Sequence, residues 1–486
     1  MGKFCTLLLA AILLHSLSAC YRMRASRGGG QIKTVNERTI STSDIVLPRG
    51  YRIELVSSGL TFPSAVAFDA QGQLYVIEAG YSYGEVWGEP KLIRIGAGGE
   101  QTVIAKGTRN GPWTGVTFHN GFFYVAEGGE AEGGRILRIS PTGDIKTLVE
   151  NLPSVGDHHT NGPVIRDGYI YFGQGTATNS GVVGGDNAEF GWLTRKKDFH
   201  DIPCGDITLA GQNYESANVL TEDPNDKTNT GAYSPFGTST TAGQVIKGRL
   251  PCTGAIMRIP LEGGNIELVA WGFRNPFGLA FSPNGKLYAT ENGYDDRGSR
   301  PVWGTGDVLW EVKQGLWHGW PDFSAGKPIK SDEEFKVPGR SPVKPLLQVY
   351  PNTPPKPSAI FGVHSSSNGL DFSTNNAFGY TGQAFVAQFG DMAPSAGKVL
   401  KPVGFKIVRV NVDDGVIRDF AVNKGKRNGP ASWLGTGGLE RPVSVKFDPG
   451  GKALYIVDFG IMKMTEKGPQ PQTGTGVIWK ITKEGI

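Results

Sequence analysis

One hairpin pattern recurs along the chain and constrains its fold more than any other feature. In each copy, an alternating apolar strand is followed by a turn containing Asp, Asn or Gly and by a second strand that leads into a glycine. Such turns and the period-two alternation are typical of β-hairpins. The six copies span residues 63–80, 112–128, 161–175, 275–293, 368–390 and 442–460.

Further strand pairs lie between these copies, for example at residues 91–95 and 134–140. Two hairpins per repeat make a four-stranded blade, so six repeats predict an all-β, six-bladed β-propeller. A β-sandwich with coincidental hairpins is the alternative, and six copies of one pattern disfavour it. Glycine contributes 71 of 486 residues and charged residues only 19%, which excludes a coiled coil or a helical bundle. The net charge of +4 comes without a basic block, so no nucleic-acid partner is expected.

The first twenty residues have the pattern of a bacterial export signal. Lys3 precedes a short apolar run, and the sequence Leu-Ser-Ala-Cys that ends at Cys20 resembles a lipobox. We expect residues 1–19 to be a lipoprotein signal peptide, with an ordinary signal peptide as the alternative. After cleavage, the mature chain would begin at a lipidated Cys20. A polar tether would then span residues 20–45, and the propeller residues 46–486. The predicted location is the periplasm or cell surface, with a lipid anchor to the membrane.

The remaining cysteines predict a disulfide across an insertion. Residues 176–252 contain no clean hairpin copy, and they include Cys204 and Cys252. An even pair of cysteines in an oxidising compartment favours a bond between them. We therefore expect a long insertion that packs on one face of the propeller and is pinned by this disulfide.

Polar residues that precede the hairpin copies should gather around the mouth of the central channel. Three of the seven histidines, His158, His159 and His364, occupy such positions. A neutral histidine there is either a general base or a side chain bonded to a loop carbonyl. Arg274 and Arg441 occupy equivalent positions, and Arg274 has no acidic residue close to it in sequence. Buried guanidinium groups need an anion, so a polycarboxylate ligand is one reading and pairing of Arg441 with its neighbour Glu440 is the other.

An acidic turn follows the fourth hairpin copy. It reads Glu-Asn-Gly-Tyr-Asp-Asp over residues 291–296. Carboxylates and amides around a glycine suit calcium, which takes six to eight oxygen ligands. The terminal glutamate of an EF-hand is absent, so an acidic turn without a metal is equally compatible with the pattern.

Two motifs resemble the glucose/sorbosone dehydrogenase family, which contains propeller quinoproteins. The first runs from Gly272 to Phe281 as Gly-Phe-Arg-Asn-Pro-Phe-Gly-Leu-Ala-Phe and continues as Pro-Asn-Gly-Lys-Leu over 283–287; Gly-Leu-Trp-His-Gly-Trp-Pro follows at 315–321. The second is His-Thr-Asn-Gly, which begins at His159 in the place of the family's base motif. The resemblance spans residues 50–482.

The resemblance implies oxidation of an aldose at C1 with pyrroloquinoline quinone (PQQ) and Ca²⁺. His159 would be the base, although His158 remains open because it directly precedes His159. Arg274 and Asn275 would bind the quinone oxygens, and Arg441 a cofactor carboxylate. The remaining roles would fall to Gly293 and Tyr294, whose carbonyls would bind calcium, and to Asn110 and Trp113 at the sugar.

The chain departs from the family at two cationic positions. Val443 stands where the family has a second arginine, and residues 387–391 lack the family's lysine. Lys398, Lys401 and Arg427 are possible substitutes.

Three functions are compatible with these observations. The first is a quinoprotein aldose dehydrogenase that passes electrons to a membrane quinone or a cytochrome, since no haem motif is present. The second is a non-catalytic propeller lipoprotein that binds a sugar or a partner. The third, a calcium-dependent lactone hydrolase, is disfavoured because the predicted channel mouth contains few acidic residues.

Overall fold

The computed structural model describes residues 38–485, except 83, 84, 87, 130, 331, 332, 394–398, 400, 466 and 467. The predicted signal peptide and Cys20 lie outside the described residues. No helix in the described part of the chain is both long and apolar enough to cross a membrane.

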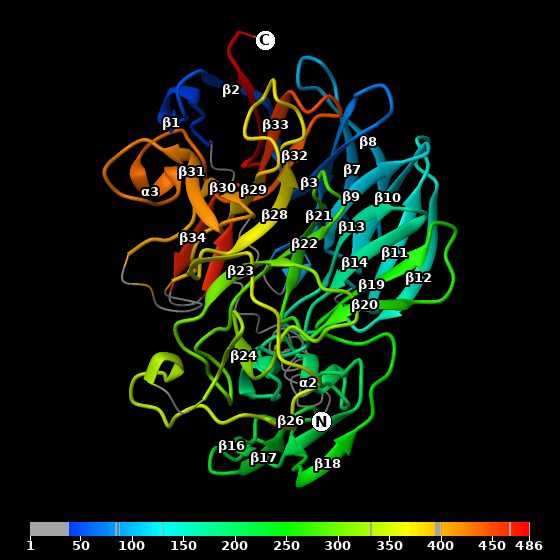
Figure 1. Ribbon diagram of the computed structural model, residues 1–486, viewed down its shortest axis with the longest axis vertical. Helices are drawn as coiled ribbons and strands as arrows, with labels where there is room; N and C mark the ends of the chain where they lie inside the picture. The colour runs from blue at the N-terminus through cyan, green and yellow to red at the C-terminus, as the bar shows by residue number, and fades with distance from the viewer. Residues whose placement is uncertain are drawn as a thin grey trace, which may run out of the picture.

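The chain folds into six four-stranded antiparallel blades, which confirms the predicted propeller (Figure 1). Each hairpin copy forms the two innermost strands of one blade. The first two blades are β3(Pro63–Phe68), β4(Leu74–Glu78), β7(Lys91–Ile95) and β8(Gln101–Lys106), then β9(Trp113–His119), β10(Phe122–Glu127), β11(Gly134–Ile139) and β12(Ile145–Leu152). The third and fourth are β13(Thr160–Arg166), β14(Tyr169–Gln174), β19(Ala255–Pro260) and β20(Glu267–Trp271), then β21(Pro276–Phe281), β22(Leu287–Glu291), β23(Gly306–Glu311) and β27(Ala359–Val363). The fifth is β28(Ser367–Phe372), β29(Ala384–Gln388), β30(Lys406–Asn411) and β31(Val416–Asn423), with β1(Ile45–Val46) added at its edge.

The sixth blade joins the two ends of the described chain. It contains β32(Pro442–Phe447), β33(Ala453–Asp458), β36(Gly476–Lys483) and, as its outermost strand, β2(Tyr51–Leu60). Tyr51 pairs with Lys483 in an antiparallel register. Closure removes the exposed sheet edges that an open array of blades would leave. Arg38, within the predicted tether, also packs here and forms a buried ion pair with Asp458.

Glycines in the innermost strands let the blades approach one another at the axis. A Cβ atom on Gly115 of β9 would lie 1.9 Å from the carbonyl oxygen of Gly162 in β13. Gly278 in β21 similarly faces the carbonyl of Asn368, where a Cβ would lie at 2.4 Å. Only glycine fits such contacts with backbone atoms. The glycines in the hairpin pattern therefore have a packing role as well as a turn role.

The second strand of every blade ends in a buried or partly buried carboxylate or amide. These residues are Glu78, Glu127, Gln174, Glu291, Gln388 and Asp458. Most of them accept hydrogen bonds from the loop that leads into the first strand of the same blade. Asp458, for example, accepts the backbone N–H groups of Glu440 and Arg441. These bonds fix the loops that surround the central channel.

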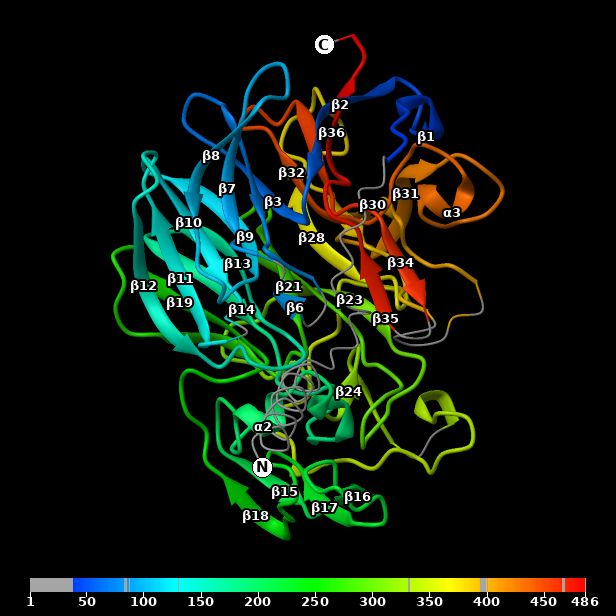
Figure 2. The ribbon, with the colours of Figure 1, turned by 180° about the vertical axis from the view of Figure 1, so that it is seen from behind.

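The insertion of the third blade is held by the predicted disulfide. Cys204 and Cys252 are bonded, with their Cα atoms 5.1 Å apart. The insertion contains β15(Ile207–Ala210), β16(Asn213–Ala217), β17(Lys227–Gly231), β18(Ala242–Ile246) and the short helix α2(Trp192–Arg195). Figures 1 and 2 show these elements gathered at one end of the molecule, beneath the blades.

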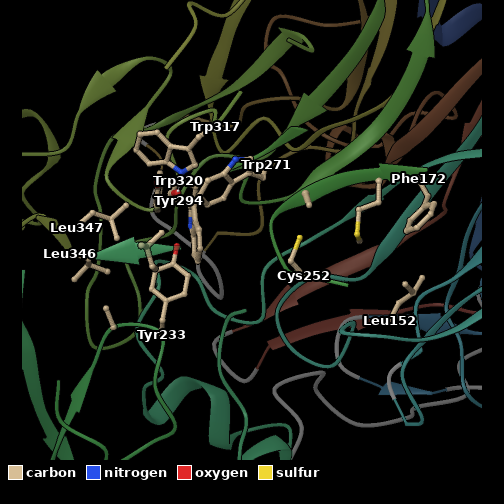
Figure 3. Close-up of a cluster of buried hydrophobic side chains, with 14 of the residues drawn as sticks. Leu152, Phe172, Tyr233, Cys252, Trp271, Tyr294, Trp317, Trp320, Leu346 and Leu347 are labelled. Atoms are coloured by element: carbon tan, nitrogen blue, oxygen red, sulfur yellow. Dashed lines mark hydrogen bonds between the residues drawn. The ribbon is translucent and has the colours of Figure 1, made fainter. Parts of the chain in front are cut away.

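A second insertion, which the sequence pattern did not indicate, interleaves with the first. Residues 312–358 of the fourth blade supply β26(Leu347–Val349), which pairs with β15. Figure 3 shows the apolar cluster between the two insertions and the blades, to which Tyr294, Trp317, Trp320 and Leu346 belong. Asp322, buried within it, is ion-paired with Arg300 and accepts the backbone N–H groups of Leu346 and Leu347.

Candidate functional site

A cavity of about 360 Å³ lies over the propeller axis. All six blades contribute to its lining, each through its first strand or the loop before that strand. In chain order, the contributing residues are Ser64, Thr114, His159, Asn275, Asn368 and Val443. The insertion adds Asp186, Glu189, Phe190 and Trp192. The lining therefore combines apolar rings with a group of charged and amide side chains, which is typical of a small-molecule site.

Both candidate base residues line this cavity. Nδ1 of His158 lies 3.0 Å from the carbonyl oxygen of Thr176, and Nδ1 of His159 lies 3.3 Å from that of Ser154. Donation from Nδ1 to these carbonyls leaves Nε2 of each ring as a proton acceptor. Burial lowers the pKa of His159 to about 4. Burial, together with the charges of the nearby arginines, also lowers the pKa of His158 well below its usual range. Both imidazoles are therefore neutral near pH 7.

Arg274 reaches the cavity as expected, but it has an acidic partner from the 291–296 turn. Its Nη2 lies 2.9 Å from Oδ2 of Asp295, and Nε of Arg297 lies 3.2 Å from the same oxygen. Burial alone would raise the pKa of Asp295, but the two guanidinium charges hold it well below its usual range. Part of the predicted calcium turn thus serves as the counterion of two arginines.

Arg297 extends this network across the cavity wall. Its Nη2 lies 2.8 Å from Oδ2 of Asp157, and its Nη1 lies 2.7 Å from Oδ2 of Asp186. One guanidinium therefore joins the base motif, the acidic turn and the insertion. Sequence reasoning missed this ion-pair network, because the partners of Arg297 lie up to 140 residues away. The only local sign of it was the Asp-Asp-Arg sequence at 295–297.

Four asparagines form a hydrogen-bonded chain beside the histidines. Asn161 donates to Asn275 at 3.0 Å, Asn275 to Asn292 at 2.9 Å, and Asn292 to Asn368 at 3.3 Å. They come from the third, fourth and fifth blades. Asn275 and His158 therefore line the same cavity.

Two of the other predicted site residues, Asn110 and Arg441, are engaged by the surrounding protein. Asn110 is buried and donates to the side chain of Glu127 and to a backbone carbonyl. Arg441 has 0% exposure and does not line the cavity. Its Nη1 donates to the carbonyl of Asp391 at 3.1 Å, behind the wall formed by residues 389–391. Glu440 is not its counterion but accepts hydrogen bonds from Ser432. The sequence pattern predicted that Arg441 and Glu440 lie at the rim of the channel. How deeply each side chain is buried depends instead on how the sixth blade packs.

The predicted calcium ligands are only partly at the cavity. Gly293 lines it, and its N–H donates to Asp307 at 2.9 Å. The side chain of Tyr294 points into the apolar cluster of Figure 3, and its carbonyl accepts a hydrogen bond from Thr305 at 3.2 Å. Among the described residues, no group of three or more His, Cys, Asp or Glu side chains is arranged to hold a metal ion.

The remaining substrate candidate, Trp113, does line the cavity, and its Nε1 donates to Glu127 at 3.1 Å. The rings of Tyr81 and His159 meet edge to face, with centroids 5.1 Å apart. Tyr81, Asp186 and Phe190 were missed by sequence reasoning because they lie outside the hairpin copies, Tyr81 in the two-residue strand β5(Tyr81–Ser82) and Asp186 in the single 3₁₀ turn Gly185–Ala188 of the insertion. No periodic signal marks such positions.

Fold and site together define a six-bladed propeller with a polar, histidine-bearing central cavity. Solved structures share this fold over most of the chain. The holo form of the PQQ domain of pyranose dehydrogenase from Coprinopsis cinerea is 14% identical, with a TM-score of 0.55, covering 94% of this chain and 99% of that chain. The family AA12 carbohydrate-active enzyme from Trichoderma reesei is 18% identical, with a TM-score of 0.53 and coverage of 93% and 100%. The PQQ-bound aldose sugar dehydrogenase from Streptomyces coelicolor is 15% identical, with a TM-score of 0.50 and coverage of 90% and 99%.

Comparisons with protein-family models and with curated proteins gave no match. At these identities, the structural likeness establishes the fold that the sequence motifs predicted.

The described lining fits the quinone-bearing end of PQQ better than its carboxylates. Arg274 and Asn275 offer N–H donors for quinone oxygens, and the apolar walls suit a planar ring system. The three carboxylates of the cofactor need cations, yet both arginines among the described lining residues are ion-paired. Of the substitutes considered, Lys401 and Arg427 are exposed, and Lys398 lies outside the described residues.

Proposed function

We propose that this chain is a quinoprotein sugar dehydrogenase that oxidises an aldose at C1. One observation carries the proposal: His159, Arg274 and Asn275, which the sequence motifs single out, line one cavity at the propeller axis. The fold likeness to the Streptomyces coelicolor and Coprinopsis cinerea enzymes supports it.

The described residues can perform the proton transfer that this oxidation requires. His159 is neutral, and its Nδ1 is held near the Ser154 carbonyl, so Nε2 can take the proton of the C1 hydroxyl. Arg274 and Asn275 would hold the quinone oxygens. PQQ, when bound, would supply an acceptor for the hydride from C1. The sugar loses one proton and one hydride in total and becomes the lactone.

The wider setting of the reaction belongs to the same proposal. The lipobox-like sequence ending at Cys20 supports a lipid-anchored protein in the periplasm or at the cell surface. The absence of a haem-binding motif in the sequence supports transfer of electrons to a membrane quinone or a separate cytochrome. Calcium would assist if the carbonyl of Gly293 takes part in its coordination.

A titration of the purified protein with PQQ and Ca²⁺ tests the proposal. We expect stoichiometric binding, followed by reduction of the quinone absorbance when an aldose is added. Arg274→Ala should weaken quinone binding, whereas Arg340→Ala, at an exposed position outside the cavity lining, should not. Failure to bind PQQ at millimolar calcium would overturn the proposal.

A second candidate, sugar binding without a quinone, is favoured by the charge of the cavity. Two guanidinium groups and six carboxylates line it among the residues that the structure describes; the carboxylates belong to Asp157, Asp186, Glu189, Asp295, Asp307 and Asp391. A trianionic cofactor is repelled by such a lining, whereas an uncharged sugar is not. Sugar binding in the absence of any PQQ binding would select this second candidate.

A further inference from the structure

Asn179, at the start of the insertion of the third blade, holds one edge of Arg274. Asn179 is 3% exposed and does not itself line the cavity. Its Oδ1 accepts hydrogen bonds from Nε of Arg274 at 3.2 Å and from Nη2 at 3.0 Å, and its backbone carbonyl accepts a further bond from Nε at 3.1 Å. Because Nη2 also donates to Asp295, every N–H group of Nε and Nη2 has an acceptor within the protein.

These contacts leave the Nη1 edge of Arg274 for a ligand. Among the described residues, the acceptor for Nη1 is the carbonyl of Asn292, at the long distance of 3.4 Å. Nη1 carries two N–H groups, so at least one of them is not used by the described protein. Arg274 and Asn292 both line the cavity. Nη1 is therefore the group through which Arg274 can donate to a ligand there.

The amide of Asn179 also fixes the turn that carries the counterion of Arg274. Its Nδ2 donates to the carbonyl of Asp295 at 2.8 Å and to that of Arg297 at 3.1 Å. Its Oδ1 accepts the backbone N–H of Asp295 at 2.9 Å. An asparagine suits this position because its short side chain offers both an acceptor and two donors. One amide thus fixes a guanidinium group together with the carboxylate that pairs with it.

Both insertions hold Asn179 in place. In the first insertion, the carboxylate of Asp201 accepts the backbone N–H of Ala177 at 2.7 Å and the hydroxyl of Thr178. From the second insertion, the indole N–H of Trp320 donates to the carbonyl of Asn179 at 3.3 Å. Buried contacts on two sides restrict the freedom of Asn179, which makes it a rigid support.

We propose that Asn179 is a positioning residue that holds Arg274 with its Nη1 edge toward the cavity. A guanidinium group whose Nε and Nη2 are already bonded cannot turn without breaking those bonds, so its direction is set before a ligand arrives. This orientation follows from the contacts of the chain itself, whereas the identity of the ligand as a quinone rests on the proposed function.

Arginine modification of the quinone-free protein tests the orientation of Arg274. Phenylglyoxal condenses with the terminal nitrogens of a guanidinium group, so engagement of Nη2 slows the reaction, and peptide mapping by mass spectrometry gives the rate at each arginine. Asn179→Ala should accelerate modification of Arg274 at least about tenfold, whereas Asn179→Asp, which retains an acceptor for Arg274, should not. Arg300 is the internal reference, because this buried arginine donates to the carbonyl of Ser180, next to Asn179, and should stay slow in every variant.

Asn423→Ala is the matched control. Nδ2 of Asn423 donates to the carbonyls of Gly429 and Leu439, and its Oδ1 accepts the N–H of Leu439, so this amide also fixes a loop, but it does not line the cavity. Asn423→Ala should lower stability in urea unfolding and leave modification of Arg274 unchanged. If circular dichroism shows that Asn179→Ala is not folded, Asn179→Ser, whose side chain is shorter by one bond, takes its place.

A titration with PQQ separates this inference from the proposed function. Asn179→Ala should weaken PQQ binding about tenfold, and it should have no further effect in the Arg274→Ala background, because both substitutions act through one contact. The positioning role would be overturned by an unchanged Arg274 rate in Asn179→Ala, by equal acceleration in Asn179→Asp, by equal acceleration at Arg300, or by additive effects on PQQ binding. Failure of the wild-type protein to bind PQQ would overturn the proposed function alone, since the modification rates are measured without quinone.

Discussion

Substitution of the proposed base gives the sharpest test of the mechanism. A positioned base typically contributes 10²–10⁴-fold to the rate, which corresponds to roughly 3–5 kcal/mol of activation free energy. We expect His159→Gln to lower kcat by that range and to leave quinone binding nearly unchanged. His158→Gln should cost much less. His119→Gln, at the end of β9 and outside the cavity lining, is the matched control.

The pH dependence of kcat provides an independent measurement. The sequence alone suggests a histidine pKa near 6.5. Burial lowers the pKa of His159 to about 4, which corresponds to roughly 3 kcal/mol against charging the ring. The base form is the neutral one, so kcat should remain level from about pH 8 to pH 6 and should fall to half near pH 4. Stopped-flow reduction of bound quinone at saturating sugar would measure this profile.

Several results would contradict this reasoning. A rate that halves near pH 6.5 would show that burial does not control the titration of His159. Loss of turnover in His158→Gln with a nearly silent His159→Gln would assign the base to His158. If both variants are active, His364 becomes the next candidate, because it also lines the cavity and its Nδ1 lies 3.8 Å from Asp295.

Three further predictions concern the scaffold. Gly115→Ala should destabilise the protein by about 3 kcal/mol in urea unfolding, because its Cβ would lie 1.9 Å from a backbone carbonyl of the next blade. Gly88→Ala is the control and should be neutral, because no atom lies within 4 Å of its added Cβ. Equal effects of the two substitutions would contradict the packing argument. Burial raises the pKa of Glu291 to about 7, so the free energy of unfolding should fall by roughly 3 kcal/mol as pH rises from about 4.5 through 7. Glu291→Gln should remove this pH-dependent loss when unfolding is measured across the same pH range. Cys204→Ser should open the 48-residue loop of the insertion to proteolysis while the blades remain resistant, and peptide mapping that finds the blades cut first would refute this.

The sequence determined the blades because their signals are local. Turn residues and period-two alternation act within about twenty residues, so each hairpin could be located without knowledge of its neighbours. The family-like motif around Arg274 and Asn275 and the paired cysteines were equally readable. These features predicted the propeller, the disulfide and the position of His158 and His159 at the central channel.

Tertiary structure decided the features that depend on residues far apart in the chain. Pairing of β2 with β36 closes the ring across more than 400 residues, and β26 joins an insertion of another blade. The ion-pair network at the cavity depends on Arg297, whose carboxylate partners come from three separate segments. Arg441 was expected from the sequence motifs to be a cofactor ligand, but it lies behind the cavity wall. Local pattern fixes where a strand begins, whereas burial and ion pairing depend on which distant segments closure of the propeller brings together.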